Sequence, residues 1–212
     1  MQPLNRKFDP TRKRYNRIAA VYDLMEKPVE MLFFRHWRRK LFSQVKGRVL
    51  EVGVGTGKNI PYYPKELKVI AVDISEKMLQ SGQKRASVAG KTVQFALMDA
   101  QHLAFKDEIF DTIVATFVFC SVSDPVEGLK ELLRVIKQDG RILLLEHVKS
   151  KHRIMGKLMD ILNPLTVKMA GFNINRDTVT NVKNAGLSIL LENNLKGDVF
   201  KELLAVPCEE IS

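Results

Sequence analysis

Cysteine is scarce in this chain: Cys120 and Cys208 are the only two among 212 residues. Two isolated thiols cannot build a multi-disulfide framework, and neither belongs to a cysteine-type zinc site. The four histidines also lack metal-ligand spacing, so we expect no bound metal. Cys120 is interpreted as a buried structural thiol, and a thiol within the functional site is the alternative.

Long apolar runs are also lacking. No segment approaches the ~18 to 20 apolar residues of a membrane-spanning helix, and no charged-then-apolar leader opens the chain. With 45% hydrophobic and 27% charged residues, the composition is that of a folded globular protein. The length suits one core, and there is no internal repeat or low-complexity linker. We therefore predict one structural domain in the cytoplasm, with peripheral attachment to a membrane as the alternative.

A glycine is missing at position 58, and this narrows the ligand class. Residues 49–57 form an apolar strand that runs into Gly53, Gly55 and Gly57. Glycines at this density allow a tight turn and close approach of a ligand to the main chain. The dinucleotide fingerprint would need a third glycine where Lys58 stands, and a P-loop would need one where Val52 stands. The turn therefore indicates a nucleotide-type cradle of another kind.

The pattern Glu51-x-Gly53-x-Gly55-x-Gly57 resembles motif I of the class I S-adenosylmethionine (SAM) methyltransferases. The later motifs of that family follow in order, and the resemblance covers roughly residues 14 to 206. It implies SAM as the cofactor, with S-adenosylhomocysteine as its product. It also implies an α/β fold: a Rossmann-like, doubly wound sheet of seven strands, mostly parallel with an antiparallel C-terminal pair. An acidic Glu51 suits a sulfonium cation better than a diphosphate.

The order of elements agrees with this fold. Strands are expected near 48–53, 68–73, 92–97, 111–118 and 140–147, with helices near 75–89 and 124–137. This alternation predicts a parallel, doubly wound sheet, and the resemblance adds antiparallel strands at 187–195 and 199–206. We expect basic helices in residues 1–45 to cover the active site. Residues 46–212 would form the SAM-binding core, with a substrate-side insert at about 151–175.

The resemblance also indicates which residues bind the cofactor. Asp73, at the end of the second strand, is expected to accept hydrogen bonds from the ribose hydroxyls, while Asp99 and Ala100 contact the adenine. Tyr15 and Tyr22 share one helix face, where a tyrosine ring can attract the sulfonium. The expected cofactor-binding residues are Tyr15, Tyr22, Glu51, Gly53, Gly55, Gly57, Asn59, Asp73, Ile74, Met78, Asp99, Ala100, Thr116 and Phe117.

The sequence assigns no definite catalytic residue. An activated methyl donor chiefly needs an aligned nucleophile, and alignment can lower a barrier by ~7 to 11 kcal/mol. An amine or thiolate acceptor needs little help from a base, whereas a ring carbon or hydroxyl needs a base within hydrogen-bond reach. The candidates are His147 and Glu146, at the end of the fifth strand, and Tyr22.

Positive charge is concentrated at the N-terminus. The net charge is +10, and residues 1–40 hold eleven basic and four acidic residues, a net +7. Apolar residues recur every fourth position from Val29 to Val45, which predicts an amphipathic helix with Arg35, Arg38, Arg39 and Lys40 on or near its other face. The apolar stripe is expected to pack on the sheet. Contact of residues 1–40 with an anionic membrane is the alternative role of the basic residues, and nucleic acid is not expected.

Two further segments bear on the methyl acceptor. Tyr15, Ala19 and Tyr22-Asp23 resemble the entry segment of quinone-biosynthesis methyltransferases and bacterial phosphatidylethanolamine N-methyltransferases, whereas 120–122, 146–148 and 173–176 resemble membrane-associated thiol methyltransferases. Residues 151–175 are rich in apolar and basic side chains; they form either a lipid-facing element or a helix pair packed on the sheet. We predict methylation of a lipophilic acceptor, a phospholipid head-group amine first and a quinone ring or small thiol next. A SAM-binding scaffold is the non-enzyme alternative.

Overall fold

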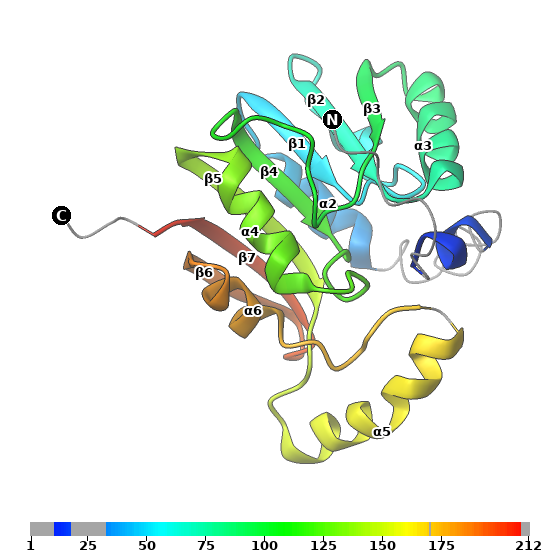
Figure 1. Ribbon diagram of the computed structural model, residues 1–212, viewed down its shortest axis with the longest axis vertical. Helices are drawn as coiled ribbons and strands as arrows, with labels where there is room; N and C mark the ends of the chain where they lie inside the picture. The colour runs from blue at the N-terminus through cyan, green and yellow to red at the C-terminus, as the bar shows by residue number, and fades with distance from the viewer. Residues whose placement is uncertain (1–10, 18–32, 170, 209–212) are drawn as a thin grey trace.

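The computed structural model describes residues 11–17, 33–169 and 171–208, and its centre is a seven-stranded sheet (Figure 1). The strand order is β3-β2-β1-β4-β5-β7-β6. β1 to β5 are parallel, while β7 runs antiparallel to both β5 and β6. This confirms the predicted fold class. The strands are β1 (Arg48–Val52), β2 (Lys68–Asp73), β3 (Val93–Leu97), β4 (Phe110–Thr116), β5 (Ile136–His147), β6 (Leu187–Lys196) and β7 (Phe200–Pro207).

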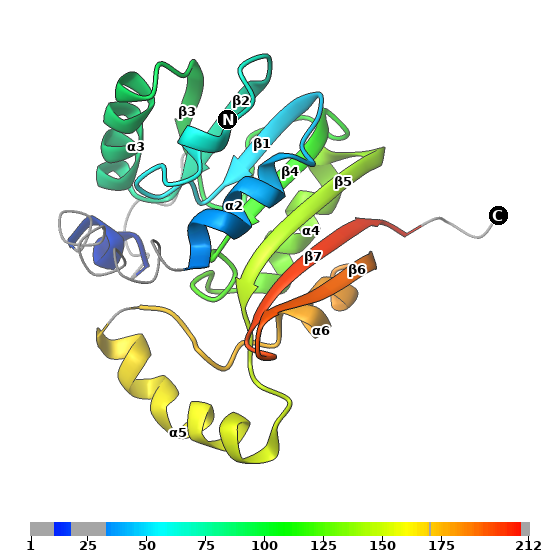
Figure 2. The same cartoon turned by 180° about the vertical axis from the view of Figure 1, so that it is seen from behind.

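Helices cover both faces of the sheet (Figures 1 and 2). One apolar core lies between the sheet and α4 with α6, and a second lies between the other face and α2 with α3. Strands buried on both faces explain the nearly continuous apolar runs of the central strands. The helices are α2 (Arg35–Phe42), the short 3-10 helix η2 (Ile60–Tyr62), α3 (Glu76–Val88), α4 (Pro125–Val135), α5 (Arg153–Met169) and α6 (Thr178–Asn184). Residues 11–17 are also helical.

Capping side chains fix where the helices beside the site begin. The Ser75 hydroxyl accepts a hydrogen bond from the Met78 amide at 3.2 Å, which confirms the predicted start of α3. Asp124 caps α4 in the same way. That helix ends two residues earlier than predicted, and β5 begins at once. The register of β5 on β4 shifts between the pairs Phe110–Ile136 and Thr112–Arg141, so the residues between these pairs form an irregular bulge inside the strand.

The described part of the N-terminal amphipathic helix ends at Phe42, before the last residue of its sequence pattern, Val45. Its expected first stripe residue, Val29, lies outside the described residues. Leu41 and Val45 are buried in the core on the α2 face, so the stripe packs on the sheet as expected. The expectation that Arg38 lies on the solvent side is wrong, because Arg38 is only 4% exposed. It lies three residues before Leu41 and therefore shares that residue's inward face.

Candidate functional site

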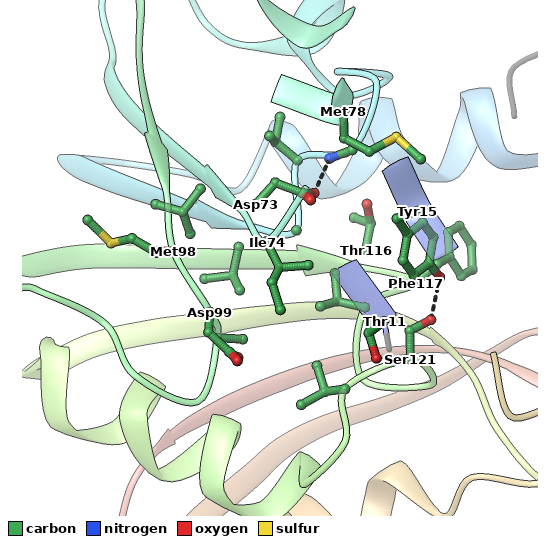
Figure 3. A pocket seen from close by; sticks show the side chains of 18 of the residues that line it. Thr11, Tyr15, Asp73, Ile74, Met78, Met98, Asp99, Thr116, Phe117 and Ser121 are labelled. Carbon is green, nitrogen blue, oxygen red and sulfur yellow. Dashed lines mark hydrogen bonds between the residues drawn. The ribbon is translucent and has the colours of Figure 1, made fainter. Parts of the chain in front are cut away.

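A pocket of about 890 Å³, partly open to solvent, lies at the carboxyl ends of β1, β2 and β4 (Figure 3). From β1 the chain continues to β2 on one side of the sheet and reaches β4 on the other, and such a switch point is where open α/β sheets bind ligands. Ten of the expected cofactor-binding residues line this pocket: Tyr15, Gly53, Gly55, Asp73, Ile74, Met78, Asp99, Ala100, Thr116 and Phe117.

The glycine turn forms the floor of the pocket. The Gly53 amide donates to the Val72 carbonyl at 2.8 Å, which ties the turn to the end of β2. Gly53 and Gly55 have φ angles of +68° and +55°, a region that side chains other than glycine rarely adopt. A Cβ at Gly53 would lie 2.5 Å from a Val118 methyl, whereas one at Gly55 would meet no protein atom within 4 Å. The turn is therefore packed at Gly53 and open at Gly55.

Asp73 connects the end of β2 to the glycine turn that follows β1. One carboxylate oxygen accepts from the Gly55 amide and the other from the Ser75 amide, both at 2.8 Å. Burial raises the pKa of Asp73 to about 6, and the hydrogen bonds from the Ser75, Gly55 and Ile74 amides limit that rise. A carboxylate has about four acceptor positions, one more than these three amides use. Asp73 can therefore still accept hydrogen bonds from a ligand.

Asp99 and its neighbours make the next part of the wall. Asp99 accepts from the backbone amide and side-chain amide of Gln101, and Ala100 is almost buried. Figure 3 shows Ile74 between Asp73 and Asp99, with Met78 and Met98 on opposite sides of them. Apolar side chains beside two carboxylates suit a flat ring with polar edges.

A hydrogen-bonded network lies directly beneath the glycine turn. Arg38 of α2 donates to Asn59 Oδ1 at 2.7 Å and to Thr116 Oγ1 at 2.9 Å. Asn59 donates in turn to Thr116 Oγ1 at 2.9 Å and to Glu51 Oε1 at 2.7 Å, and Tyr63 donates to the other Glu51 oxygen. The network joins α2, β1, η2 and β4 at one point.

Glu51 differs from its expected place. It is fully buried and lies behind the pocket wall, as does Asn59. Burial raises the pKa of Glu51 to about 7, while hydrogen bonds from Tyr63 and Asn59 and the charge of Arg38 oppose the rise. Gly57 also lies behind the wall. A Cβ there would come within 3.0 Å of the Gly82 Cα, so this glycine allows the turn to pack closely against α3.

Phe117 turns the chain at the end of β4. Its φ angle is +58°, which is strained for a non-glycine residue and is common at ligand sites. Its amide donates to the Leu145 carbonyl at 2.7 Å. Its ring packs 4.5 Å from that of Phe34, and the Arg38 guanidinium lies 5.5 Å from the ring centre. These contacts hold the left-handed backbone in place at the pocket wall.

Tyr15 covers the pocket from the N-terminal helical segment 11–17. Its hydroxyl lies 2.6 Å from Ser121 Oγ, on the loop after β4 (Figure 3). Thr11 of the same segment also lines the pocket. Tyr22, the second expected tyrosine, lies outside the described residues.

The two candidate bases on β5 do not line the pocket. Glu146 is fully buried and accepts from the Val118 and Phe119 amides at 2.9 and 3.1 Å. Burial raises its pKa to about 7, and its contacts show that it holds the loop after β4. His147 packs edge-on against the Phe200 ring, with ring centres 5.0 Å apart, and burial lowers its pKa.

Cys120 lies in the same loop and is buried. Burial, followed by the nearby charge of Glu146, raises the pKa of its thiol to about 12. The thiol therefore stays protonated at neutral pH and is a poor nucleophile. This agrees with a structural role.

Several pocket residues were not predicted from the sequence. No sequence signal identifies Arg38 as a pocket residue, because its position in the amphipathic pattern predicts a basic residue on the surface. Ser121 follows Cys120 in one of the segments that carried a family resemblance, and Lys58 entered only as an excluded glycine. Thr11, Arg38, Lys58, Met98, Ser121 and Val122 belong to this group.

Comparison with known proteins gives matches to methyltransferases. Residues 50–144 match the family model described as a methyltransferase domain. The ubiquinone/menaquinone biosynthesis C-methyltransferase of Azotobacter vinelandii is 32% identical over 186 residues, which are 82% of this chain and 73% of that protein. The phosphatidylethanolamine N-methyltransferase of Cereibacter sphaeroides is 38% identical over 115 residues, 52% of this chain and 57% of that protein.

Solved structures agree on the fold. The crystal structure of a SAM-dependent methyltransferase from Aquifex aeolicus matches with a TM-score of 0.67 and 22% identity, covering 94% of this chain and 98% of that one. A possible histamine N-methyltransferase from Thermotoga maritima matches with the same TM-score and 20% identity, covering 91% and 98%. At these identities the likeness concerns the fold alone.

Proposed function

Because this chain belongs to the SAM-dependent methyltransferases, in the group of the ubiquinone/menaquinone C-methyltransferases, we propose that it methylates a lipophilic acceptor. A phospholipid head-group amine is the first candidate. SAM supplies an electrophilic methyl group on a sulfonium and leaves as S-adenosylhomocysteine. The protein's own task is to bind both partners, align them and exclude water.

The pocket wall suits the adenosine part of SAM. Asp73, at the end of β2, would accept from the ribose hydroxyls. The apolar side chains of Ile74 and Met78 would contact the adenine faces, and Asp99 would accept from its amino group. The open space at Gly55 leaves room for a ligand against the backbone.

The other end of the pocket suits the amino-acid part. SAM carries a carboxylate there, and Arg38 is a buried cation in the wall beside Thr116. A guanidinium binds a carboxylate with charge-assisted hydrogen bonds. We assign Arg38 to this carboxylate, with Asn59 and Thr116 as residues that orient it. Tyr15 would close the pocket over the sulfonium.

The observation that favours an amine is the chemistry of the wall. Among the described residues that line the pocket, the acidic ones are Asp73 and Asp99, and none is a histidine. Both acids have cofactor roles in this proposal, while Glu146 and His147 lie outside the wall. A neutral amine or a thiolate needs little help from a base, but a ring carbon or hydroxyl does. This supports N-methylation or S-methylation.

A quinone ring is the second candidate. The observation in its favour is that the matching quinone-biosynthesis enzymes align with 82% of this chain, against 52% for the phosphatidylethanolamine enzyme. C-methylation would require a base that the described part of the wall does not provide. Tyr22, outside the described residues, remains a candidate for that role.

Incubation with labelled SAM would separate these acceptors. The panel would contain phosphatidylethanolamine vesicles, a polyprenyl quinol and a small alkyl thiol, with products identified by mass spectrometry. We expect methylated phosphatidylethanolamine, and no product with Asp73→Ala. Methylation of the quinol or the thiol without the lipid would replace the first candidate, and binding of SAM without any methylation would support a scaffold.

A further inference from the structure

The helix α5 presents an apolar face to solvent. Ile154 and Ile161 are 83% and 75% exposed, and Leu165 is 54% exposed. Met155, Leu158 and Leu162 lie in the same stripe and are also exposed. These positions recur every three or four residues, which places them side by side on one face of the helix. Figures 1 and 2 both show α5 projecting away from the body of the protein.

The opposite face of α5 is attached through polar contacts. Asp160 accepts from Lys149 at 2.7 Å and from Asn175 at 2.9 Å. Asn163 donates to Asn173 at 3.1 Å and accepts from the Ile174 amide at 2.9 Å. Met159 is the buried apolar residue of this face, only 6% exposed. The helix is thus held by its polar side.

This polarity is the reverse of an ordinary surface helix, which turns its apolar stripe to the core and its charges to water. Among the described helices, α2, α3 and α4 by contrast bury apolar residues against the sheet. Six large apolar side chains in one exposed patch indicate an interaction surface.

Charges around the stripe indicate what lies against it. Lys157 and Lys168 are exposed and occupy one border of the stripe, and Arg153 stands at the first turn. The helix holds one acidic residue, Asp160, and that residue is paired with Lys149 away from the stripe. An apolar stripe with a cationic border is typical of helices that lie in the surface of anionic bilayers, whereas the cores of protein interfaces are depleted of lysine.

We propose that α5 lies on the surface of an anionic phospholipid bilayer, with its apolar stripe inserted between the head groups and its lysines on the lipid phosphates. None of the described helices has the length and apolarity to cross a bilayer, so α5 would lie along the interface. The proposal concerns α5 alone and does not depend on residues 1–40, most of which lie outside the described part of the chain. The proposal holds for any of the acceptors considered above.

The connection that follows α5 leads directly to the pocket. The Asn173 amide and side chain both donate to the Cys120 carbonyl, at 2.9 and 3.0 Å. Ser121, the next residue, meets the Tyr15 hydroxyl in the pocket wall. Docking of α5 would therefore bring the loop after β4, and with it the pocket, close to the lipid surface.

The test is sedimentation with phosphatidylcholine vesicles that contain or lack phosphatidylglycerol, without acceptor or SAM. The test variant is Ile154→Ser/Ile161→Ser/Leu165→Ser. The matched control is Val88→Ser/Leu190→Ser, which removes apolar side chains that are 91% and 64% exposed elsewhere. A charge variant, Lys157→Glu/Lys168→Glu, probes the lysine border. SAM affinity and circular dichroism verify that each variant is folded.

We expect wild type to bind the phosphatidylglycerol vesicles, more weakly as salt rises. The triple serine variant should lose at least about tenfold in affinity, because burial of even one such side chain is equivalent to about a tenfold change. The control should bind like wild type, and the charge variant should lose affinity mainly for the anionic vesicles. The proposal is overturned if wild type does not bind at low salt or if the triple variant binds equally well. It is also overturned if light scattering shows a dimer that the triple variant abolishes while vesicles are not bound.

Discussion

The buried Glu51 makes the stability of the fold depend on pH. Its pKa is raised from 4.5 to about 7 in the folded protein, chiefly by burial. In the unfolded chain the carboxyl is solvated and titrates near its ordinary value. Between these two pKa values the folded protein holds a proton that the unfolded chain has released. Stability from this group is therefore fully present below about pH 4.5 and declines as the pH rises to about 7.

The size of the effect follows from the shift. One pKa unit corresponds to about 1.4 kcal/mol, so a rise from 4.5 to about 7 corresponds to about 3 kcal/mol of unfolding free energy. Glu146 and Asp73 have raised pKa values as well, and their contributions have the same sign. Glu51→Gln should remove only the part that belongs to Glu51. The amide keeps the shape of the side chain and can still bond to Asn59 and Tyr63.

Urea unfolding at fixed ionic strength, from about pH 5 to about pH 8, measures how the free energy of unfolding depends on pH. Wild type should lose about 2.5 kcal/mol more than Glu51→Gln over that range, since a small part of the effect is already lost at pH 5. Tyr63→Phe removes a hydrogen bond that lowers the pKa of Glu51, so its loss of stability should extend to higher pH. Glu66→Gln changes an exposed glutamate and serves as the matched control.

The outcome that would refute this reasoning is a Glu51→Gln variant whose stability falls with pH as steeply as that of wild type. Glu51 would then be ionised in the folded state across the whole range. Its charge would have to be balanced by Arg38 through Asn59, and the network beneath the pocket would be an ion pair.

Three other measurements test the site. Asp73→Asn should weaken SAM binding about ten- to a hundredfold in titration calorimetry, because an acceptor for charge-assisted hydrogen bonds is lost; unchanged affinity would contradict the ribose assignment. Arg38→Met keeps the apolar stem but removes the donor to Asn59, so urea unfolding should show a loss of about 2 to 3 kcal/mol and calorimetry a weaker SAM complex. Unimpaired SAM binding by a folded variant would exclude a carboxylate contact. Iodoacetamide should label Cys208 and leave Cys120 intact until unfolding, and rapid labelling of a Cys208→Ser variant, followed by mass spectrometry, would contradict the burial of Cys120.

Local signals explain how much of the site was predictable. Asp73 and Asp99 each follow an apolar strand in the sequence, and parallel strands place their carboxyl ends at one edge of the sheet. The glycine spacing fixes the turn after β1, which lies beside Asp73. Each of these features depends on a few neighbouring residues, and the structure brings all of them into one pocket.

Arg38 and α5 were less predictable because their surroundings come from distant parts of the chain. Arg38 bonds to partners 21 and 78 positions away, Asn59 and Thr116, so its pattern within α2 alone suggests a surface charge. The helical period of α5 shows that one face is apolar. It does not show whether that face meets the sheet or the solvent. The early start of β5 has a similar origin, since it pairs with β4 rather than following a local turn signal.

The strand order has a consequence for how the protein is made. Val49 of β1 pairs with Thr112 of β4, sixty-three positions later in the chain. Pairing over so long a separation is slow to form, and until β4 arrives the edge of β1 stays open to unwanted strand pairing. A nascent chain that ends before Thr116 has the glycine turn and Asp73 but not the opposite wall. SAM stabilises only the state that binds it, so it can assist only the last stage of folding and not the vulnerable intermediate.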